Sequence, residues 1–392
     1  MPLHLTAPKR GFSVPEFGGR LARAQAIMGQ HLLDGLLLTT PQNIRYFTGF
    51  DSQFWESPTR PWFVVVPAKG EPIAVIPEIG GPEMALTWIR DIRTWPAPRP
   101  ADDGQSLLAG VIGALSRKHG RIGAELGREM TLRMPVIEFL SLRDRVPGVE
   151  FANGSPCIWD IRMIKTDAEA AHIHYICQIA SEAYEALPSK IRIGDTEREV
   201  CRTLRIDIAA RGADATPFLP AISGPGGVAQ IVCGPHDRTL IDGDILFIDT
   251  GSTYDGYFCD FDRNYAIGRV SDAARRAHET VWDATEAGLK AARPGNTTED
   301  VWRAMSKIVQ DAGSLGNNVG RLGHGLGLQL TEPPSHMPGD GTAICEGMVL
   351  TIEPGMEYAP GKMIVHEENV AITSEGSRLL TKRAPRELPA IS

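Results

Sequence analysis

The stretch GDILFIDTG at residues 243–251 has a near copy, GMVLTIEPG, at residues 347–355. In each copy a glycine precedes an apolar run, and the run ends in a carboxylate that is followed two residues later by another glycine. Short apolar runs bounded by glycine are typical of buried β-strands. Asp249 and Glu353 occupy the same position in the two copies. The repeat therefore predicts two similar strand units, packed about a pseudo-two-fold axis with their carboxylates near it.

Each copy is followed by a turn and a second apolar run that carries more acid: YFCDFD at 257–262 and MIVHEE at 363–368. If residues 255–256 form a two-residue hairpin turn, Asp249 lies opposite Asp262. Asp260 then lies one diagonal away on the same face of the sheet. We therefore expect at least four acids in matched positions of the repeat to gather at one place.

Carboxylates packed on one face repel one another, and a multivalent cation removes that repulsion. An isolated aspartate in a strand is more often a solvated strand end or a salt-bridge partner. Several acids that interrupt two matched apolar hairpins instead favour a metal site. Oxygen ligands with one or two imidazoles suit Mn²⁺, Fe²⁺, Co²⁺ or Zn²⁺. Asp262 shares the face of Asp260 and is either a ligand or a group that supports one.

Two histidines fall within the acidic segments. His324 lies in GHGLG at 323–327, where flanking glycines allow close backbone approach and leave the imidazole room to reach a metal. His236 precedes the first strand of the repeat and could polarise a substrate carbonyl or stabilise an oxyanion. Three others are interpreted as structural or packing residues: His366, which should point away from Glu367, and His172 and His174 on a predicted helix.

Composition bounds the class of protein. At 392 residues the chain has the length of two or three domains, with 42% hydrophobic and 22% charged residues. The net charge of −8 disfavours nonspecific binding to nucleic acid. No apolar run approaches the roughly 18 residues of a membrane helix, and the N-terminal residues lack the apolar core of a secretory signal. Six scattered cysteines favour reduced thiols. We expect a cytoplasmic protein without nucleic-acid or membrane partners.

Helix and strand signals alternate over the first 150 residues and predict a mixed-sheet α/β domain, with strands at 35–40 and 120–125 and a hairpin over 62–77. A domain boundary is predicted near 151–165, where FANGSP at 151–156 is turn-rich. Capping boxes and periodicity then predict four helices: from Thr166 to about Leu187, from Thr196 to Gly212, and over 271–292 and 297–312.

With these features in place, nearly the whole chain resembles the pita-bread metallopeptidase family, which includes Xaa-Pro dipeptidase, aminopeptidase P, methionine aminopeptidase and creatinase. NIRYFTG at 43–49 is similar to the family's N-terminal segment, and RMIK at 162–165 to its domain junction. The resemblance implies an α+β protein: a creatinase-like N-terminal α/β domain over 1–155, then a pita-bread catalytic domain with a pseudo-two-fold repeat over 160–392. It also implies a homodimer.

The resemblance further implies two divalent metal ions, manganese foremost, with iron, cobalt and zinc as alternatives. The family's five ligands fall on Asp249, Asp260, His324, Glu353 and Glu367. Asp260 and Glu367 would bridge the ions. The implied enzyme is a hydrolase resembling Xaa-Pro dipeptidase and aminopeptidase, in which a metal-activated water attacks an amide carbonyl. Glu353 would carry the proton, and His236 would stabilise the tetrahedral intermediate.

Two positions depart from the peptidase pattern. Thr331 replaces a second histidine and Val365 replaces an arginine, and both groups normally contact substrate. A non-peptide enzyme therefore stays open, either a creatinase-like C–N hydrolase or a lyase of dimethylsulfoniopropionate. Such lyases carry an extra aspartate where this chain has Gly251, and creatinase-like members often lose metal ligands, so the pattern favours a hydrolase. A catalytically inactive binding module would also have lost the ligands.

The segment FWESPTRPW at 54–62 combines two tryptophans, two prolines and a cation in a predicted loop. It is either a packed loop or an apolar surface at a subunit contact. In family dimers the N-terminal domain of one subunit approaches the partner's active site. By that resemblance Trp55 or Arg60 would cap the neighbouring site, and with His236 and Thr331 would contact a small-molecule or short-peptide substrate.

Overall fold

The computed structural model describes residues 6–57, 59–316 and 320–392. The chain divides into two compact units. The first comprises Lys9–Arg162, and the second comprises Met163–Ser392 together with the N-terminal residues up to Pro8. Over the described ranges, no helix combines the length and apolar character that crossing a membrane requires.

The unit of Lys9–Arg162 is built on a six-stranded sheet in the order β4-β3-β2-β1-β5-β6. Its strands are β1 (Gly35–Leu38), β2 (Phe63–Pro67), β3 (Ile73–Pro77), β4 (Asp91–Trp95), β5 (Arg121–Ala124) and β6 (Glu150–Asn153). Its helices are α1 (Val14–Gln30), α2 (Pro41–Thr48), α3 (Gly81–Met84), α4 (Gln105–Ala114), α5 (Val136–Arg145) and α6 (Ser155–Met163), which ends at the division between the units. Parallel and antiparallel neighbours both occur, and the predicted β2–β3 hairpin is confirmed.

The turn-rich segment of residues 151–156 lies within the predicted boundary region of 151–165 and connects a strand directly to a helix. Residues 151–156 form no extended turn, because β6 pairs with β5 up to Asn153 and α6 begins at Ser155. The Asn153 side chain accepts a hydrogen bond from the Ser155 amide, and Gly154 packs against the backbone of Gly123. A cap residue and one glycine therefore complete the connection from strand to helix.

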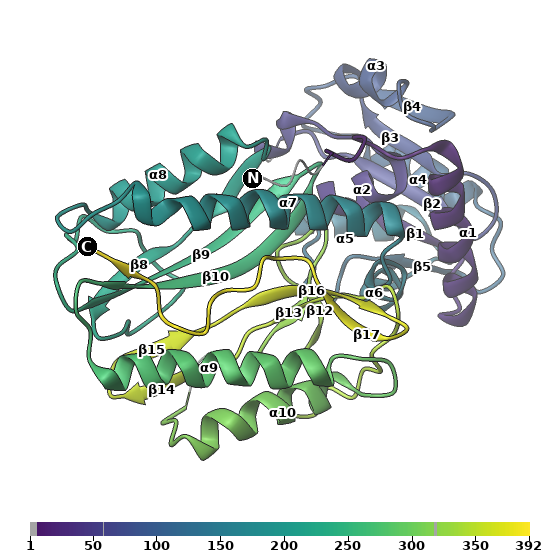
Figure 1. Cartoon of the computed structure of the whole chain (residues 1–392). Helices are drawn as coiled ribbons and strands as arrows, with labels where there is room; N and C mark the ends of the chain where they lie inside the picture. The colour runs from purple at the N-terminus through teal and green to yellow at the C-terminus, as the bar shows by residue number, and fades with distance from the viewer. Residues whose placement is uncertain (1–5, 58, 317–319) are drawn as a thin grey trace. The chain divides into compact units, whose positions relative to one another are not determined.

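The second unit places two groups of strands between two pairs of helices (Figure 1). Its helices are α7 (Asp167–Ala186), α8 (Glu197–Ala210), α9 (Asp272–Ala291) and α10 (Thr298–Asp311). The first group of strands comprises β7 (Ala215–Phe218), β8 (Ala221–Pro225), β9 (Asp244–Tyr254), β10 (Tyr257–Ile267) and β18 (Ala390–Ile391). The second group has β11 (His324–Gly325), β12 (Glu332–Ser335), β13 (Val349–Ile352), β16 (Glu368–Thr373) and β17 (Gly376–Leu379), with β14 (Gly355–Ala359) and β15 (Lys362–Val365) as a separate hairpin.

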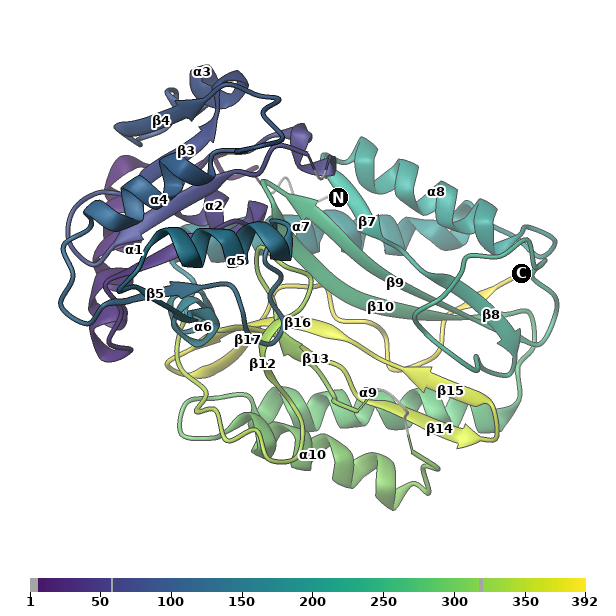
Figure 2. The same cartoon turned by 180° about the vertical axis from the view of Figure 1, so that it is seen from behind.

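The helices cover the outer faces of the strands. Figure 2 shows α7 and α8 beside β7 to β10, and α9 and α10 on the side of β13 to β17. All four predicted helices are confirmed within a residue or two of their expected ends. The capping boxes that begin at Thr166 and Thr196 are both formed, because each threonine and the glutamate three residues later satisfy each other's backbone amide.

The first copy of the repeat forms the predicted hairpin. β9 and β10 pair without interruption from Tyr254–Tyr257 outward, and Asp249 lies opposite Asp262. In the second copy Ile352 pairs with Glu368. Gly355 pairs with Val365, in the same register. Glu353 therefore lies opposite Glu367.

A bulge between Glu357 and Ala359 makes the second hairpin one residue longer than the first. The structural counterpart of Asp262 is therefore Glu367, and that of Asp260 is Val365. The expectation that all four predicted acidic ligands occupy matched positions is wrong for the second strands, because an inserted residue changes which residues correspond across the two copies.

Reciprocal hydrogen bonds confirm the pseudo-two-fold relation. The Asn264 amide donates to the carbonyl of Val365. At the matching position of the other copy, the Asn369 amide donates to the carbonyl of Asp260 and accepts from the Asp260 amide. The strands that carry the predicted ligands are thus fixed to one another by side chains from both copies.

Candidate metal centre

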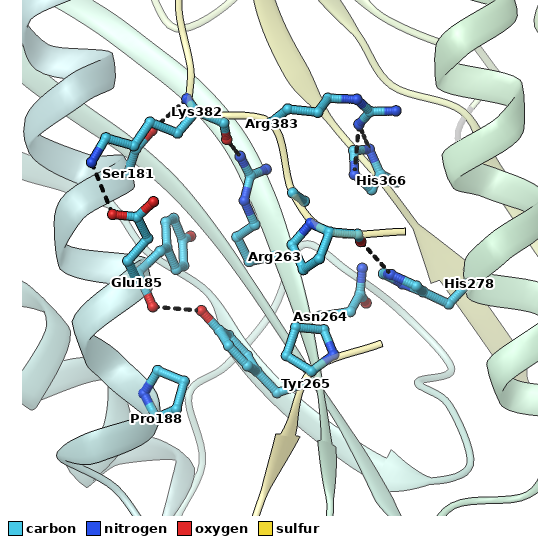
Figure 3. A pocket seen from close by; sticks show the side chains of 14 residues that line it. Ser181, Glu185, Pro188, Arg263, Asn264, Tyr265, His278, His366, Lys382 and Arg383 are labelled. Atoms are coloured by element: carbon cyan, nitrogen blue, oxygen red, sulfur yellow. Dashed lines mark hydrogen bonds and ion pairs between the residues drawn. The ribbon is translucent and has the colours of Figure 1, made fainter. Parts of the chain in front are cut away.

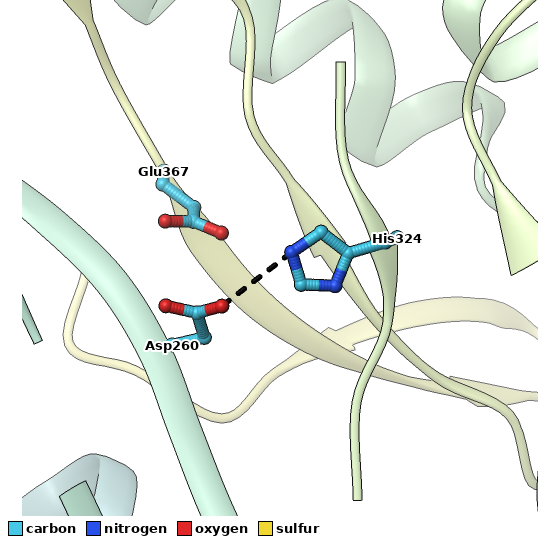
Figure 4. A group of neighbouring side chains, drawn as sticks. All are labelled: Asp260, His324 and Glu367. Carbon is cyan, nitrogen blue, oxygen red and sulfur yellow. Dashed lines mark ion pairs between the residues drawn. The ribbon is translucent and has the colours of Figure 1, made fainter. Parts of the chain in front are cut away.

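Three of the predicted ligands already form a compact group. One ligand atom from each of Asp260, His324 and Glu367 lies within 4.8 Å of the others (Figure 4). The Nε2 atom of His324 is 3.4 Å from Oδ2 of Asp260. The three residues come from β10, β11 and the junction between β15 and β16, so both copies of the repeat contribute.

His324 is held in the orientation that a ligand needs. Its Nδ1 lies 2.8 Å from the carbonyl oxygen of Gly325, so Nδ1–H donates and Nε2 keeps its lone pair for the acidic group. Burial and the charge of Arg321 lower the pKa of His324 to about 3, so the imidazole is neutral at ordinary pH. Gly323 allows close approach of the backbone, because a Cβ atom at this position would collide with the carbonyl oxygen of Thr351.

The acids of the site are strongly destabilised as anions. Burial raises the pKa of Asp249 to about 7 and, with repulsion from Asp249, that of Glu353 to about 8. Burial and the neighbouring carboxylates raise the pKa values of Asp260 and Glu367 well above their ordinary range. Without a cation, burial and mutual repulsion therefore favour the protonated forms of these groups.

Unsatisfied oxygens point to the same conclusion. Among the described residues, Oδ1 of Asp249, Oδ2 of Asp262 and Oε1 of Glu367 are buried and have no hydrogen-bond partner. A buried carboxylate oxygen without a donor is costly, and a bound cation supplies the missing partner. Carboxylates with one neutral imidazole are a donor set that fits Mn²⁺, Fe²⁺, Co²⁺ or Zn²⁺. The residues present therefore fit divalent metal ions.

Arg263 forms hydrogen bonds to the strands that carry the acids. Arg263 donates from Nη1 to the carbonyls of Asp262 and Glu367 at 2.6 and 3.0 Å, and from Nη2 to Glu368 at 3.1 Å. Arg263 also lines a cavity of about 220 Å³ (Figure 3). The ring of His366 lies 3.0 Å from Nη1 of Arg383 and lines this cavity, which agrees with its predicted orientation away from Glu367.

The predicted substrate-side residues of this unit have different surroundings. His236 is exposed on the loop before β9, and its backbone amide donates to Glu197 at 2.9 Å. Within the described part of the chain, no hydrogen bond or ion pair joins its ring to the predicted ligands. Thr331 accepts a hydrogen bond from Nη2 of Arg321 at 3.4 Å. Its role toward substrate stays a prediction, as does that of His236.

Arg321 is a further residue beside the acidic group, and its position there was not predicted from the sequence. Its charge lowers the pKa values of His324 and Asp260, and its Nη1 donates to Ser335 at 3.3 Å. Its place three residues before His324 is the only signal in the sequence, and no strand pattern marks it. Pairing of the segment around His324 with β12 brings Arg321 beside Thr331.

Trp55 and Arg60 lie in the other compact unit. Trp55 packs edge-on against Phe50 and Trp62 at ring-centroid distances of 5.9 and 5.4 Å. Arg60 adopts a φ of +58°, and its guanidinium lies 5.3 Å from the Phe54 ring centroid. The segment is thus a packed aromatic loop, and its predicted approach to a partner's active site stays a prediction.

Comparison with known proteins agrees with this geometry. Residues 171–374 match metallopeptidase family M24, and residues 20–164 match the creatinase/prolidase N-terminal domain. A probable dipeptidase PepE of Mycobacterium tuberculosis is 29% identical over 384 residues, covering 97% of this chain and 98% of that protein. An Xaa-Pro dipeptidase of Pyrococcus furiosus is 28% identical over 377 residues, covering 94% and 99%.

Solved structures give the same result. Dipeptidase PepE from Mycobacterium ulcerans superposes with a TM-score of 0.84 at 29% identity, covering 97% of this chain and 99% of that one. Recombinant prolidase from Thermococcus sibiricus gives 0.85 at 26% identity, covering 97% and 100%. The predicted combination of a creatinase-like N-terminal fold with a pita-bread fold is confirmed. The chain belongs to metallopeptidase family M24 and is a metal-dependent hydrolase of the peptidase class.

Proposed function

We propose that this chain hydrolyses short peptides of the Xaa-Pro type at a pair of divalent metal ions. The five proposed ligands are Asp249, Asp260, His324, Glu353 and Glu367. The observation that carries the proposal is the buried, mutually repelling set of carboxylates beside a neutral imidazole, with two of the five ligands leaving an oxygen unsatisfied. The relatives named Xaa-Pro dipeptidase and prolidase supply the substrate class.

Two bound divalent ions would lower the pKa of a shared water and polarise the scissile carbonyl. The chain's own groups then handle substrate and protons. Glu353 is only partly buried, so its carboxylate could accept a proton from water and return it to the leaving amine. Asp260 and Glu367 would hold the ions together with His324, because one ligand atom from each lies in the compact group.

His236 and Arg321 are the candidates for contacts with substrate. His236, which is exposed before β9, would stabilise the oxyanion of a bound substrate. Arg321, beside Thr331, would place a positive charge near the substrate. We include manganese as the native metal, a homodimeric assembly and a cytoplasmic location in the same proposal. All six cysteines are free in the structure, which agrees with a reducing compartment.

A non-peptide C–N hydrolase with the same fold is the second candidate function. Val365 packs in an apolar cluster with Phe247 and Met363, so this position offers no cation to a substrate. Thr331 has a hydroxyl where the peptidase pattern has an imidazole, and this hydroxyl accepts a hydrogen bond from Arg321. These two features favour a substrate recognised differently from an ordinary prolyl peptide.

Elemental analysis of the purified protein, beside turnover assays on Gly-Pro, an Xaa-Pro tripeptide and creatine, separates the candidates. We expect two divalent ions per chain and metal-dependent cleavage of Gly-Pro. Cleavage of the tripeptide in preference to Gly-Pro would indicate an aminopeptidase. Bound metal with no activity on either peptide would contradict the peptidase proposal, and turnover of creatine would replace it with the second candidate.

A further inference from the structure

Asp262 is a buried acid outside the set of five proposed ligands. It lies directly opposite Asp249 in the β9–β10 hairpin. Because Glu353 lies opposite Glu367 in the second hairpin, the pseudo-two-fold axis relates Asp262 to Glu367. One member of this pair is a proposed ligand, so the symmetry of the fold directs the other member toward the same centre.

The surroundings of Asp262 provide a second observation. The side chain is 1% exposed, and Oδ1 accepts a hydrogen bond from the Glu367 amide at 3.2 Å. Oδ2 is buried and has no hydrogen-bond partner among the described residues. The terminal nitrogens of the neighbouring Arg263 donate to three backbone carbonyls and to Glu368, so they do not serve this oxygen. The buried Oδ2 therefore lacks a partner that a cation would supply.

We propose that Asp262 binds, through Oδ2, the metal ion that Asp249 holds, as the pseudo-symmetric partner of Glu367. This inference rests on the proposed dinuclear function and adds a sixth protein ligand to it. Asp249 and Asp262 would then hold one ion through carboxylate oxygens, while His324 would serve the other. An all-oxygen position selects a hard ion such as Mn²⁺, whereas an imidazole also suits Fe²⁺, Co²⁺ or Zn²⁺.

Asp262 could instead act only by holding the Glu367 amide, and two substitutions separate these roles. Asp262→Asn keeps an oxygen that accepts from the Glu367 amide but removes the anionic ligand. Asp262→Ala removes both. If the side chain only positions Glu367, the asparagine variant binds metal like the wild type. If it is a ligand, both variants lose the same ion.

The test is titration of the metal-free protein with Mn²⁺, followed by calorimetry and by the amount of bound manganese per chain. We expect two ions in the wild type, and in Asp262→Asn one tight ion with the second weakened at least about 100-fold. The matched control is Asp244→Asn, at the far end of β9, where the acid pairs with Arg238 and should not affect either ion. Two ions of unchanged affinity in Asp262→Asn would overturn the inference and leave the proposed function intact. A wild type that binds no manganese would overturn both.

A second measurement covers the case in which the variants fail to fold. In crystals of the wild-type protein loaded with Mn²⁺, Oδ2 of Asp262 should lie within about 2.6 Å of one ion, the range of oxygen ligands to hard divalent cations. Direct coordination supports the inference. An Asp262 carboxylate separated from both ions by water, or turned away from them, overturns it.

Discussion

Removing metal from this protein should make its stability fall as the pH rises. The acids of the site have raised pKa values, so in the metal-free native state they retain protons that the unfolded chain has already released. The native state therefore binds more protons than the unfolded state, and its stability decreases with increasing pH until the acids ionise.

The magnitude follows from the number of protons held. Unfolded Asp and Glu are ionised above about pH 5, and each proton kept only by the native state costs about 1.4 kcal/mol per pH unit. Between pH 7 and 8, Asp249 (pKa about 7) and Glu353 (pKa about 8) together retain on average about one proton. This proton corresponds to a loss of about 1.4 kcal/mol per pH unit, and the raised pKa values of Asp260 and Glu367 act in the same direction.

The stability loss should be measured above about pH 6.5. Below this pH, buried histidines make the stability rise with pH, which opposes the effect of the acids. Burial lowers the pKa values of His324 to about 3 and of His278 and His336 to about 4. Their neutral native forms bind fewer protons than the unfolded chain, so their contribution to stability grows as the pH rises to about 6.5 and is constant above it.

Scanning calorimetry of the chelated protein at about pH 7 and about pH 8 measures the effect. For a unit of this size the expected loss lowers the midpoint of unfolding by about 3 to 6 °C. Protein reloaded with Mn²⁺ is the control and should not show this loss, because bound ligands are already ionised. A chelated protein whose unfolding midpoint stays constant or rises over this range would contradict the prediction. It would mean that the acids are ionised in the metal-free native state or lie too far apart to repel one another.

Four substitutions give further predictions, on metal binding, stability and substrate affinity. Asp260→Ala should abolish both metal binding and turnover, and a variant that retains either would remove Asp260 from the ligand set. Lys165→Met breaks the buried 3.1 Å ion pair with Glu332 and should destabilise the protein by about 3–5 kcal/mol in denaturant unfolding, with recovery when Glu332→Gln is added. Gly323→Ala should weaken metal affinity, because the residue adopts a φ of +126° and a Cβ would meet the backbone. Arg60→Ala should raise KM while the metal content stays unchanged, and an unchanged KM would rule out its predicted contact with substrate.

The first hairpin could be predicted from the sequence because its turn has two residues and no bulge. Alternation and turn length alone then place Asp249 opposite Asp262. The helices could be predicted for a similar reason, since capping boxes such as the one beginning at Thr166 are local signals. These features depend only on residues that are close together in the chain.

The second hairpin could not be predicted in the same way. Its extra residue lies in a bulge between Glu357 and Ala359, and the apolar pattern on either side does not reveal it. The correspondence between Asp262 and Glu367 therefore appears only in the structure. Arg321 was missed for a different reason: its approach to Thr331 depends on pairing between segments that no sequence pattern aligns.

Anomalous diffraction from Mn²⁺-loaded crystals tests the central claim most directly, because it locates the ions without reference to activity. Two peaks roughly 3.5–4 Å apart should appear between the two hairpins, flanked by Asp260 and Glu367, with His324 beside one of them. A single peak elsewhere in the molecule, or none near these three residues, would contradict the account.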